Sequence, residues 1–470
     1  MSTEILKTQS RFDRSKVFPL AIKRKHEAQG GLVIGDHGTG KSTLQRGFLH
    51  QIKARGETAI IHDPHGEFTE EFYDEANGDL ILNPLDTRFP FWSPGLEVEK
   101  GNEAEGLILG RSLYPVLPNE QPFFKHQAAG LLAFLTAYHQ PTGYELGEWM
   151  ANDDVLDEKV KGTEFERTLT KDSAGQRSGI IGTLNVAGPA FRLLPDEAKR
   201  TFSTKAWAKS RRGWIFITNT TETRDALYPL QSMWVDLLIA RLLSIGQPKG
   251  LPFTWMFLDE LAAFQHLPKL KLGITEGRKA GLSIFLGFHG KSQIEGIYGK
   301  DADTLFSLPR TKIFLRTAEE GAAKWASGMI GEVEMMRVRE SRPAHEFFSQ
   351  GRGHNYSVER TIEPLVLYST IMRLPDLEGY LCYENMVVPI RLATIPKTVI
   401  AEKYLPAPLR QRWFAADQDA SEASESGTPQ QKEAAEQYEE CPPDDYPDEE
   451  PEESEPQPEK ALTNAYGMEI

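Results

Sequence analysis

Glycines, one lysine and several hydroxyl side chains follow a short apolar run in residues 30–43, GGLVIGDHGTGKST. Residues 32–34 are predicted to form a buried strand, and Ser42 begins a helical pattern. Glycines allow such a loop to curl until its N–H groups point inward, and the helix N-terminus adds partial positive charge. The spacing fits G-x-x-x-x-G-K-[ST], which indicates binding of a nucleoside triphosphate. The alternative is a glycine-rich turn with a solvated lysine. With average residue usage, however, the probability that this motif occurs by chance somewhere in a chain of this length is on the order of one in a hundred.

This loop predicts a role for several of its residues. Lys41 is expected to reach the β- and γ-phosphates, and the Ser42 hydroxyl is expected to ligate Mg²⁺. A GTPase switch is disfavoured because the chain has no N-K-x-D motif for reading guanine. Mg²⁺ is a predicted cofactor, and the resemblance described below implies that the nucleotide is ATP. The predicted cofactor-binding residues are Gly35, Asp36, His37, Gly38, Thr39, Gly40, Lys41, Ser42 and Thr43.

A second candidate site lies in PFTWMFLDELAAF, where Asp259 and Glu260 stand at the predicted end of an apolar strand. In a parallel sheet, side chains at the C-terminal ends of strands face the ligand crevice, beside the loop described above. An aspartate there can hold Mg²⁺, and a following glutamate can orient or deprotonate an attacking water. The alternative is the capped start of a helix, since acidic residues favour first turns. The phosphate loop some two hundred residues upstream favours the functional interpretation.

Short apolar runs alternate with helical patterns along most of the chain. Such runs include residues 213–219, GWIFITN, and the segments FTWMFLDE, LSIFLGF and TKIFLRT. Apolar strands that alternate with helices indicate a parallel sheet buried on both faces, and therefore an α/β fold. The predicted organisation is a basic N-terminal segment (1–29), a nucleotide-binding domain in two parts (30–95 and 205–412), an all-α insertion between them (96–204) and a tail (413–470).

The net charge of −15 is concentrated in the tail. Residues 417–470 carry 18 Asp and Glu against 2 Lys, a net charge of −16, whereas residues 1–416 carry 51 basic and 50 acidic residues. Because this acidic tail has few aliphatic residues and many prolines, it is predicted to be disordered. The sequence leaves open whether it is a solubilising segment or a docking arm for a basic partner.

Cysteine content and hydropathy bear on the compartment. Cys382 and Cys441 do not make a disulfide framework, so a reducing compartment is predicted. No run approaches 18 consecutive apolar residues, and the N-terminus has no signal-peptide pattern. We therefore expect a cytoplasmic protein, or one held at the inner membrane through a partner. Residues 7–25 carry seven basic residues and one acid, which suits DNA or a membrane surface but is also common on a solvated face.

Two further groups of residues are weaker candidates. His62 and His65, in HDPHG, have a metal-like spacing, but at a strand end they are expected to line the nucleotide crevice instead. Residues 205–214, KAWAKSRRGW, interleave basic and aromatic side chains, which suits backbone neutralisation and base stacking on single-stranded nucleic acid. A solvated loop before a strand is the equal alternative for that segment.

A longer stretch resembles a known family. The segment FLDELAAFQHLPKLKLGITEGRKAGLSIFLGFHGKSQIEGIYG resembles the type IV secretion coupling proteins, the TraD- and TrwB-type conjugation ATPases related to the FtsK and HerA motors. The segments TKIFLRTAEEGAAKWASGMIGEVE, IMRLPDLEGYL and HDPHGEF continue the resemblance, which spans roughly residues 31–392. It implies a RecA-like P-loop NTPase fold, in which a parallel sheet carries an all-α domain and six subunits form a ring around DNA.

The resemblance also implies roles for residues outside the loop. Asp259 would support the metal together with Ser42, and Glu260 would be the catalytic carboxylate. Arg278, in EGRKAG, matches the arginine that the family offers to the nucleotide of a neighbouring subunit. His289 stands where the family usually has a glutamine that senses the terminal phosphate. Because the charge of histidine varies near neutral pH, hydrolysis is expected to be slow or pH-dependent.

The function implied by the resemblance is that of an ATP-driven motor, assembled as a homo-hexamer. It would engage single- or double-stranded DNA, or a relaxase–nucleoprotein complex, and pass it toward a type IV secretion channel, with the all-α domain contacting this substrate. The family's N-terminal transmembrane pair is missing, which indicates either a soluble member recruited by a membrane partner or a shortened chain. Two alternatives stay open: a FtsK/HerA-like DNA translocase unrelated to secretion, and a non-motor adaptor that uses ATP as an assembly switch.

Overall fold

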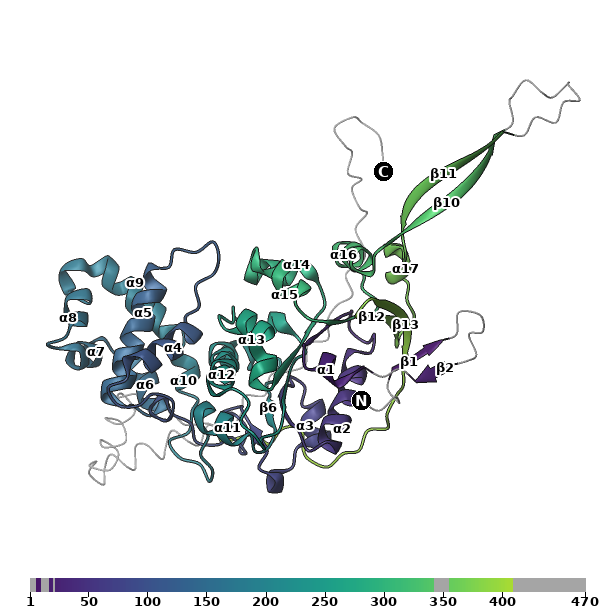
Figure 1. Ribbon diagram of the computed structural model, residues 1–470. Coiled ribbons are helices and arrows are strands. Elements are labelled where there is room, and N and C mark those ends of the chain that lie inside the picture. Colours follow the sequence, from purple (N-terminus) through teal and green to yellow (C-terminus); the bar gives the residue numbers. More distant parts are fainter. Residues whose placement is uncertain (1–5, 10–16, 20–21, 342–354, 409–470) are drawn as a thin grey trace, which may run out of the picture. The chain divides into compact units, whose positions relative to one another are not determined.

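The computed structural model describes residues 6–9, 17–19, 22–341 and 355–408 (Figure 1). These ranges belong to one compact unit, which extends to Pro408. The predicted acidic tail, residues 413–470, and part of the predicted basic segment 1–29 lie outside the described residues.

A mixed sheet of eleven strands forms the centre of the described part of the chain, in the order β2-β1-β13-β12-β9-β3-β8-β7-β4-β6-β5. Seven neighbouring strands run parallel, which confirms the predicted α/β fold; they are β3 (Gly31–Ile34), β4 (Thr58–His62), β5 (Leu80–Ile81), β6 (Ile215–Ile217), β7 (Thr254–Leu258), β8 (Leu282–Phe288) and β9 (Thr311–Phe314). Four antiparallel strands extend the sheet beyond β9 and were not predicted; they are β1 (Leu6–Gln9), β2 (Val17–Pro19), β12 (Glu378–Tyr383) and β13 (Met386–Leu392).

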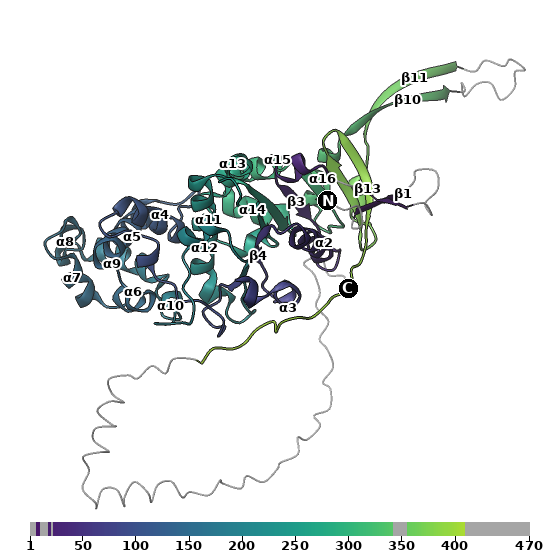
Figure 2. The ribbon, with the colours of Figure 1, turned by 60° about the horizontal axis from the view of Figure 1, so that its bottom comes forward.

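The parallel strands are buried on both faces, because successive side chains enter two different cores. Leu32 and Ile34 of β3 belong to one apolar cluster, whereas Val33 belongs to the other. Helices α2 (Lys41–Ala54) and α3 (Glu67–Phe72) cover the face that contains Val33 (Figures 1 and 2). The opposite face is covered mainly by α12 (Arg224–Ile245), α13 (Leu270–Glu276), α14 (Lys291–Tyr298), α15 (Asp301–Ser307) and α16 (Glu320–Ile330).

Between β5 and β6 the regular structure is entirely helical, as the spacing of apolar residues predicts. The main helices are α4 (Glu103–Leu113), α5 (Phe123–Phe134) with a π-helical turn (Leu135–His139), α6 (Gly143–Met150), α7 (Asp153–Val160), α8 (Glu164–Thr168), α9 (Ala174–Asn185), α10 (Gly188–Phe191) and α11 (Thr204–Ser210). The buried Glu97 carboxylate joins the two ends of this insertion, because it accepts hydrogen bonds from Thr204 N–H (2.6 Å), Thr204 Oγ1 (2.5 Å) and Trp92 Nε1 (3.0 Å).

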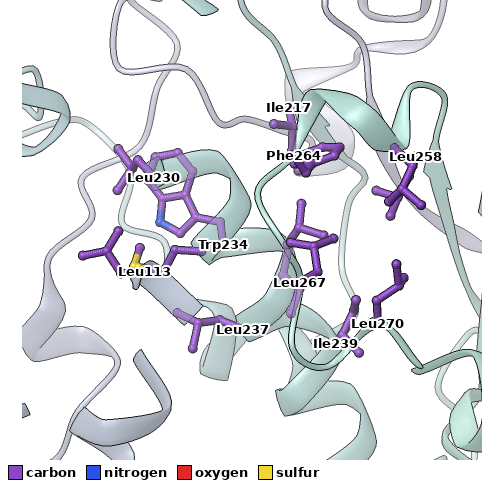
Figure 3. Packing of buried hydrophobic residues seen from close by; sticks show 14 of the residues in the cluster. Leu113, Ile217, Leu230, Trp234, Leu237, Ile239, Leu258, Phe264, Leu267 and Leu270 are labelled. Carbon is purple, nitrogen blue, oxygen red and sulfur yellow. The ribbon is translucent and has the colours of Figure 1, made fainter. Parts of the chain in front are cut away.

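Helix α12 packs against both the insertion and the segment that follows β7. Leu113 of α4 lies beside Trp234 of α12, and Ile239 of α12 lies near Leu270 of α13 (Figure 3). The same buried cluster contains Leu258, at the end of β7. The α12 helix therefore connects the insertion to the part of the sheet that carries the second candidate site.

A hairpin near the C-terminal end of the described residues was not predicted. Strands β10 (Glu332–Ser341) and β11 (Asn355–Pro364) form a separate antiparallel hairpin, followed by the short helix α17 (Tyr368–Ile371). Within the described ranges, no helix is both long enough and apolar enough to cross a membrane.

Candidate nucleotide-binding site

The glycine-rich loop joins β3 to α2 at the C-terminal edge of the parallel strands. Gly38 and Gly40 have φ angles of 76° and 115°, a left-handed region in which a side chain would be strained. Thr39 Oγ1 donates to the Asp36 carbonyl at 2.8 Å, and Asp36 N–H donates to the Arg316 carbonyl at 2.9 Å. These contacts hold the loop in a curled form beside the N-terminus of the 14-residue helix α2.

Lys41, His289 and Glu260 form a hydrogen-bonded chain across the mouth of this loop. Lys41 Nζ lies 2.7 Å from His289 Nδ1 and also donates to the Gly35 carbonyl at 2.6 Å. His289 Nε2 lies 2.7 Å from Glu260 Oε2. One tautomer satisfies both contacts: Nδ1 accepts from the lysine, and Nε2–H donates to the carboxylate. Burial lowers the pKa of Lys41.

Asp259 directly follows β7, precedes Glu260 and lies beside α2. Its Oδ1 accepts a hydrogen bond of 2.6 Å from Gln45 Nε2. Burial raises the pKa of Asp259 to about 6, and the Glu260 carboxylate acts in the same direction, against the opposing effect of Lys41. Gln45 was missed in the sequence, although it stands one helical turn after Lys41 and therefore on the same face of α2.

A cavity of about 880 Å³ opens between the loop and the ends of β4, β6, β7 and β8. It is lined by most of the sequence-predicted residues, namely Asp36, His37, Gly38, Gly40, Lys41, Ser42, Thr43, Asp259, Glu260 and His289. Gly35 and Thr39 are not in its lining, and both instead make contacts that hold the loop. Lining residues that the sequence analysis missed include Asp63, Asn219, Arg224 and Gln293.

The two histidines of HDPHG lie in different environments. His65 lines the cavity, as predicted, but His62 does not. The His62 ring is buried at the end of β4 and packs 4.5 Å from the Phe264 ring, and burial lowers its pKa to about 3. The expectation that both histidines line the crevice is therefore wrong for His62, because its side chain points into the core. Within the described residues, no cluster of three or more His, Cys, Asp or Glu side chains is arranged to hold a metal.

Arg278 is distant from the other predicted site residues of the same chain. It is exposed in a 3₁₀ turn, Gly277–Ala280, that precedes β8, whereas His289 directly follows β8. The strand has seven residues, which at ~3.3 Å per residue places its ends roughly 20 Å apart. Arg278 and the cavity therefore lie at opposite edges of the sheet.

The segment 205–214 is neither a stacking surface nor a solvated loop. Trp207 and Trp214 are each only 4% exposed, so neither ring is available to a base. Lys205 forms ion pairs with Glu99 at 2.6 Å and with Glu105 at 2.9 Å. The alternation of basic and aromatic residues arises because α11 places its tryptophan in the core while its lysines remain at the surface.

Comparisons with known proteins decide the family. The family model described as "Type IV secretion-system coupling protein DNA-binding domain" matches residues 14–394, most of the chain. The chain belongs to this family. The resemblance found in the sequence and the expected RecA-like fold with an all-α insertion are confirmed.

Individual relatives are similar in sequence and fold. The coupling protein TraD of Escherichia coli (strain K12) is 29% identical over 430 residues, covering 86% of this chain and 58% of TraD. The chain thus spans less than two thirds of this relative. The unbound structure of the conjugative coupling protein TrwBΔN70 matches with a TM-score of 0.71 and 29% identity, covering 81% of this chain and 88% of TrwBΔN70.

Two further structures extend the comparison. TrwB in complex with ADP and Mg²⁺ has a TM-score of 0.71 and 27% identity, covering 86% of this chain and 92% of that structure. VirB4 of Thermoanaerobacter pseudethanolicus, at 13% identity and a TM-score of 0.54 over 84% of this chain and 98% of VirB4, shares the fold.

Proposed function

We propose that this chain is an ATP-driven coupling protein that engages DNA, or a relaxase–nucleoprotein complex, and delivers it to a type IV secretion channel. The observation that carries the proposal is the convergence of Lys41, Asp259, Glu260 and His289 on one cavity at the C-terminal edge of the parallel strands. In open α/β sheets, ligands bind at this edge.

The residues fit Mg²⁺ and ATP. The volume of about 880 Å³ is in the range of small-molecule sites. Glu260 Oε1 is buried and makes no hydrogen bond to any described residue, so it is available for a further partner. Mg²⁺ commonly takes one or two protein ligands together with phosphates and waters, which suits Ser42 and Asp259 without a larger cluster. TrwB has been solved with ADP and Mg²⁺, with an ATP analogue and with a GTP analogue.

Each of these side chains has a task in phosphoryl transfer to water. The loop N–H groups and Lys41 would hold the phosphates, and Ser42 and Asp259 would hold the metal, which neutralises charge on the phosphate oxygens. Glu260 would orient the attacking water and accept its proton. His289 bonds to both Lys41 and Glu260, so it would align the carboxylate and report on the occupancy of the site.

Arg278 would act across a subunit interface in a homo-hexamer. Its exposure, and the roughly 20 Å length of β8 between it and its own cavity, support a role at the nucleotide of a neighbouring copy. Arginines that act in this way stabilise the charge that develops on the transferred phosphoryl group. The protein would work in the cytoplasm or at the inner membrane through a partner.

The decisive experiment measures ATPase and GTPase rates with no DNA, with single-stranded DNA and with double-stranded DNA, alongside the mass of the assembly. We expect ATP hydrolysis that DNA stimulates in a multi-subunit assembly. Nucleotide-dependent assembly without DNA-stimulated turnover would refute the motor and favour the adaptor. A transfer assay in cells distinguishes a coupling protein from a translocase unrelated to secretion, because only the former is needed for transfer.

A further inference from the structure

Arg211 is a fully buried arginine whose partners are all oxygen atoms of neutral groups. It follows α11, has a left-handed φ of 47°, and is 1% exposed. Its guanidinium donates to the Gly246 carbonyl (2.5 Å), to Gln247 Oε1 (2.6 Å) and to the Ala280 carbonyl (2.8 Å). Weaker contacts reach the carbonyls of Pro252 and Gly281, each at 3.3 Å.

These acceptors belong to three separate segments. Gly246 and Gln247 directly follow α12, and Pro252 precedes β7. Ala280 and Gly281 end the turn that carries Arg278. Gly281 N–H in turn donates to the Arg278 carbonyl at 3.3 Å. One planar guanidinium therefore connects the last helix of the all-α insertion to the backbone of the Arg278 turn.

Burial of a charge without a carboxylate partner is costly, so shape alone does not account for an arginine here. An apolar side chain of similar volume would avoid the desolvation of the guanidinium. It could not, however, bind oxygen atoms from all three segments at once, which the two terminal nitrogens of the planar guanidinium do with their four N–H groups. This arginine therefore fixes the orientation of the segments that it joins, including the turn Gly277–Ala280 that precedes β8.

We infer that Arg211 is a positioning residue for Arg278. It holds the turn in the orientation from which Arg278 reaches the neighbouring subunit's nucleotide, and it makes that orientation depend on the seating of α11 in the insertion. The inference rests on the proposed role of Arg278 in trans. It replaces nucleic-acid contact as the role of Arg211 in KAWAKSRRGW.

The test compares Arg211→Lys and Arg211→Gln in the full chain. Arg212, the next residue, is exposed, so Arg212→Lys and Arg212→Gln are matched controls. Loss of the fork should misplace Arg278 and lower the DNA-stimulated turnover number by about 10²-fold, as small misplacements of catalytic groups do. The KM for ATP and the affinity for a fluorescent ATP analogue should stay within about twofold, since the cavity lies at the other edge of the sheet.

Mixed assemblies separate positioning from general damage. An Arg211 variant has an intact phosphate loop and a misplaced arginine, so mixing it with Lys41→Ala should restore activity at interfaces that combine the two intact halves. Mixing it with Arg278→Ala should restore nothing, because neither partner supplies a correctly placed arginine. Co-assembly is checked by mass in every mixture.

A reference mixture distinguishes failure of the trans action of Arg278 from failure of its positioning by Arg211. If Arg278→Ala mixed with Lys41→Ala shows no recovery despite co-assembly, the proposed action of Arg278 in trans is wrong, and the inference falls with it. If that mixture recovers but the Arg211 variants mixed with Lys41→Ala do not, or if the Arg211 variants alone keep normal turnover, Arg211 does not position Arg278. Should both Arg211 variants fail to fold, Gln247→Leu removes one acceptor, leaves Arg211 in place and is subject to the same criteria.

Discussion

Asp236 offers a quantitative test of the junction between the insertion and the sheet. This aspartate of α12 is fully buried. Ser112 Oγ of α4 donates to Asp236 Oδ2 at 2.6 Å, and Lys269 N–H, just before α13, donates to Oδ1 at 2.6 Å. The titratable groups that act on it are the Lys269 ammonium and the Tyr298 hydroxyl. Burial raises the pKa of Asp236 to about 6.

The sign of the pH effect follows from the direction of this shift. The pKa is about 6 in the folded protein and close to the ordinary 3.8 in the unfolded chain, so the folded state binds the proton more tightly. The resulting stabilisation is fully present below about pH 3.8 and is lost as the pH rises through about 6. A shift of about 2 units at 1.36 kcal/mol per unit makes this contribution roughly 3 kcal/mol.

Asp236→Asn should remove that pH dependence while keeping the contacts. The amide oxygen can still accept from Lys269 N–H, and the amide nitrogen can donate to Ser112 Oγ, whose own hydrogen can go to the Ile108 carbonyl at 3.0 Å. Relative to wild type, the variant should gain roughly 2–3 kcal/mol in the free energy of unfolding between pH 4 and pH 8.

Urea unfolding of both proteins at pH 4, 5, 6, 7 and 8 measures this difference. Asp225→Asn, on the exposed first turn of the same helix, is the control for removing a carboxylate that is not buried. A wild-type-minus-variant difference that stays constant from pH 4 to pH 8 would refute the reasoning, because it would mean that Asp236 is ionised at the same pH in both states.

Further predictions concern the nucleotide-binding site, the acidic tail and the segment 205–214. Lys41→Ala should abolish hydrolysis, and Glu260→Gln should bind ATP while turnover stalls; steady-state ATPase and nucleotide-binding assays check both, and near-normal turnover of either removes its proposed role. Deleting the residues after Ala416 should leave basal ATPase intact and weaken partner engagement, since backbone contacts to the body extend to Ala407; unchanged transfer in cells would count against docking. Trp207→Ala should lower the free energy of unfolding, measured by calorimetry, by about 3–5 kcal/mol without altering the salt dependence of DNA binding. Unchanged stability together with an altered salt dependence would restore the hypothesis that Trp207 stacks on bases.

The parallel part of the sheet could be predicted because its strands carry a local signal. Strands buried on both faces read as largely apolar runs, as in Thr254–Leu258 and Leu282–Phe288, and their ends are marked by charge or glycine. The phosphate loop is similarly local, because its conformation depends on glycines within six residues of one another. The contact of Lys41 with His289 could not be read from the sequence, since the two residues meet only through the pairing of β3 with β8.

The antiparallel extension carries a weaker signal. Strand β12 alternates between half-buried and buried residues, and β1 pairs with β13, some 380 residues further along the chain. Strands β10 and β11 pair only with each other and expose Val338, Val358 and Ile362, so no core pattern marks them. The role of the segment 205–214 was predicted wrongly for a related reason. Composition does not distinguish a buried tryptophan from one that faces a ligand, because only tertiary packing decides between them.

Arg278 illustrates how closeness in sequence differs from closeness in space. It stands 11 residues before His289, yet β8 is extended between them and separates the two by the length of that strand, roughly 20 Å. No rotamer spans that distance, and bending the chain would break the pairing of β8 with β3 and β7. If Arg278 acts on a nucleotide at all, that nucleotide belongs to another copy. A single chain would then bind ATP with its own loop and hydrolyse it poorly, and hydrolysis, unlike binding, would rise with the concentration of subunits able to assemble.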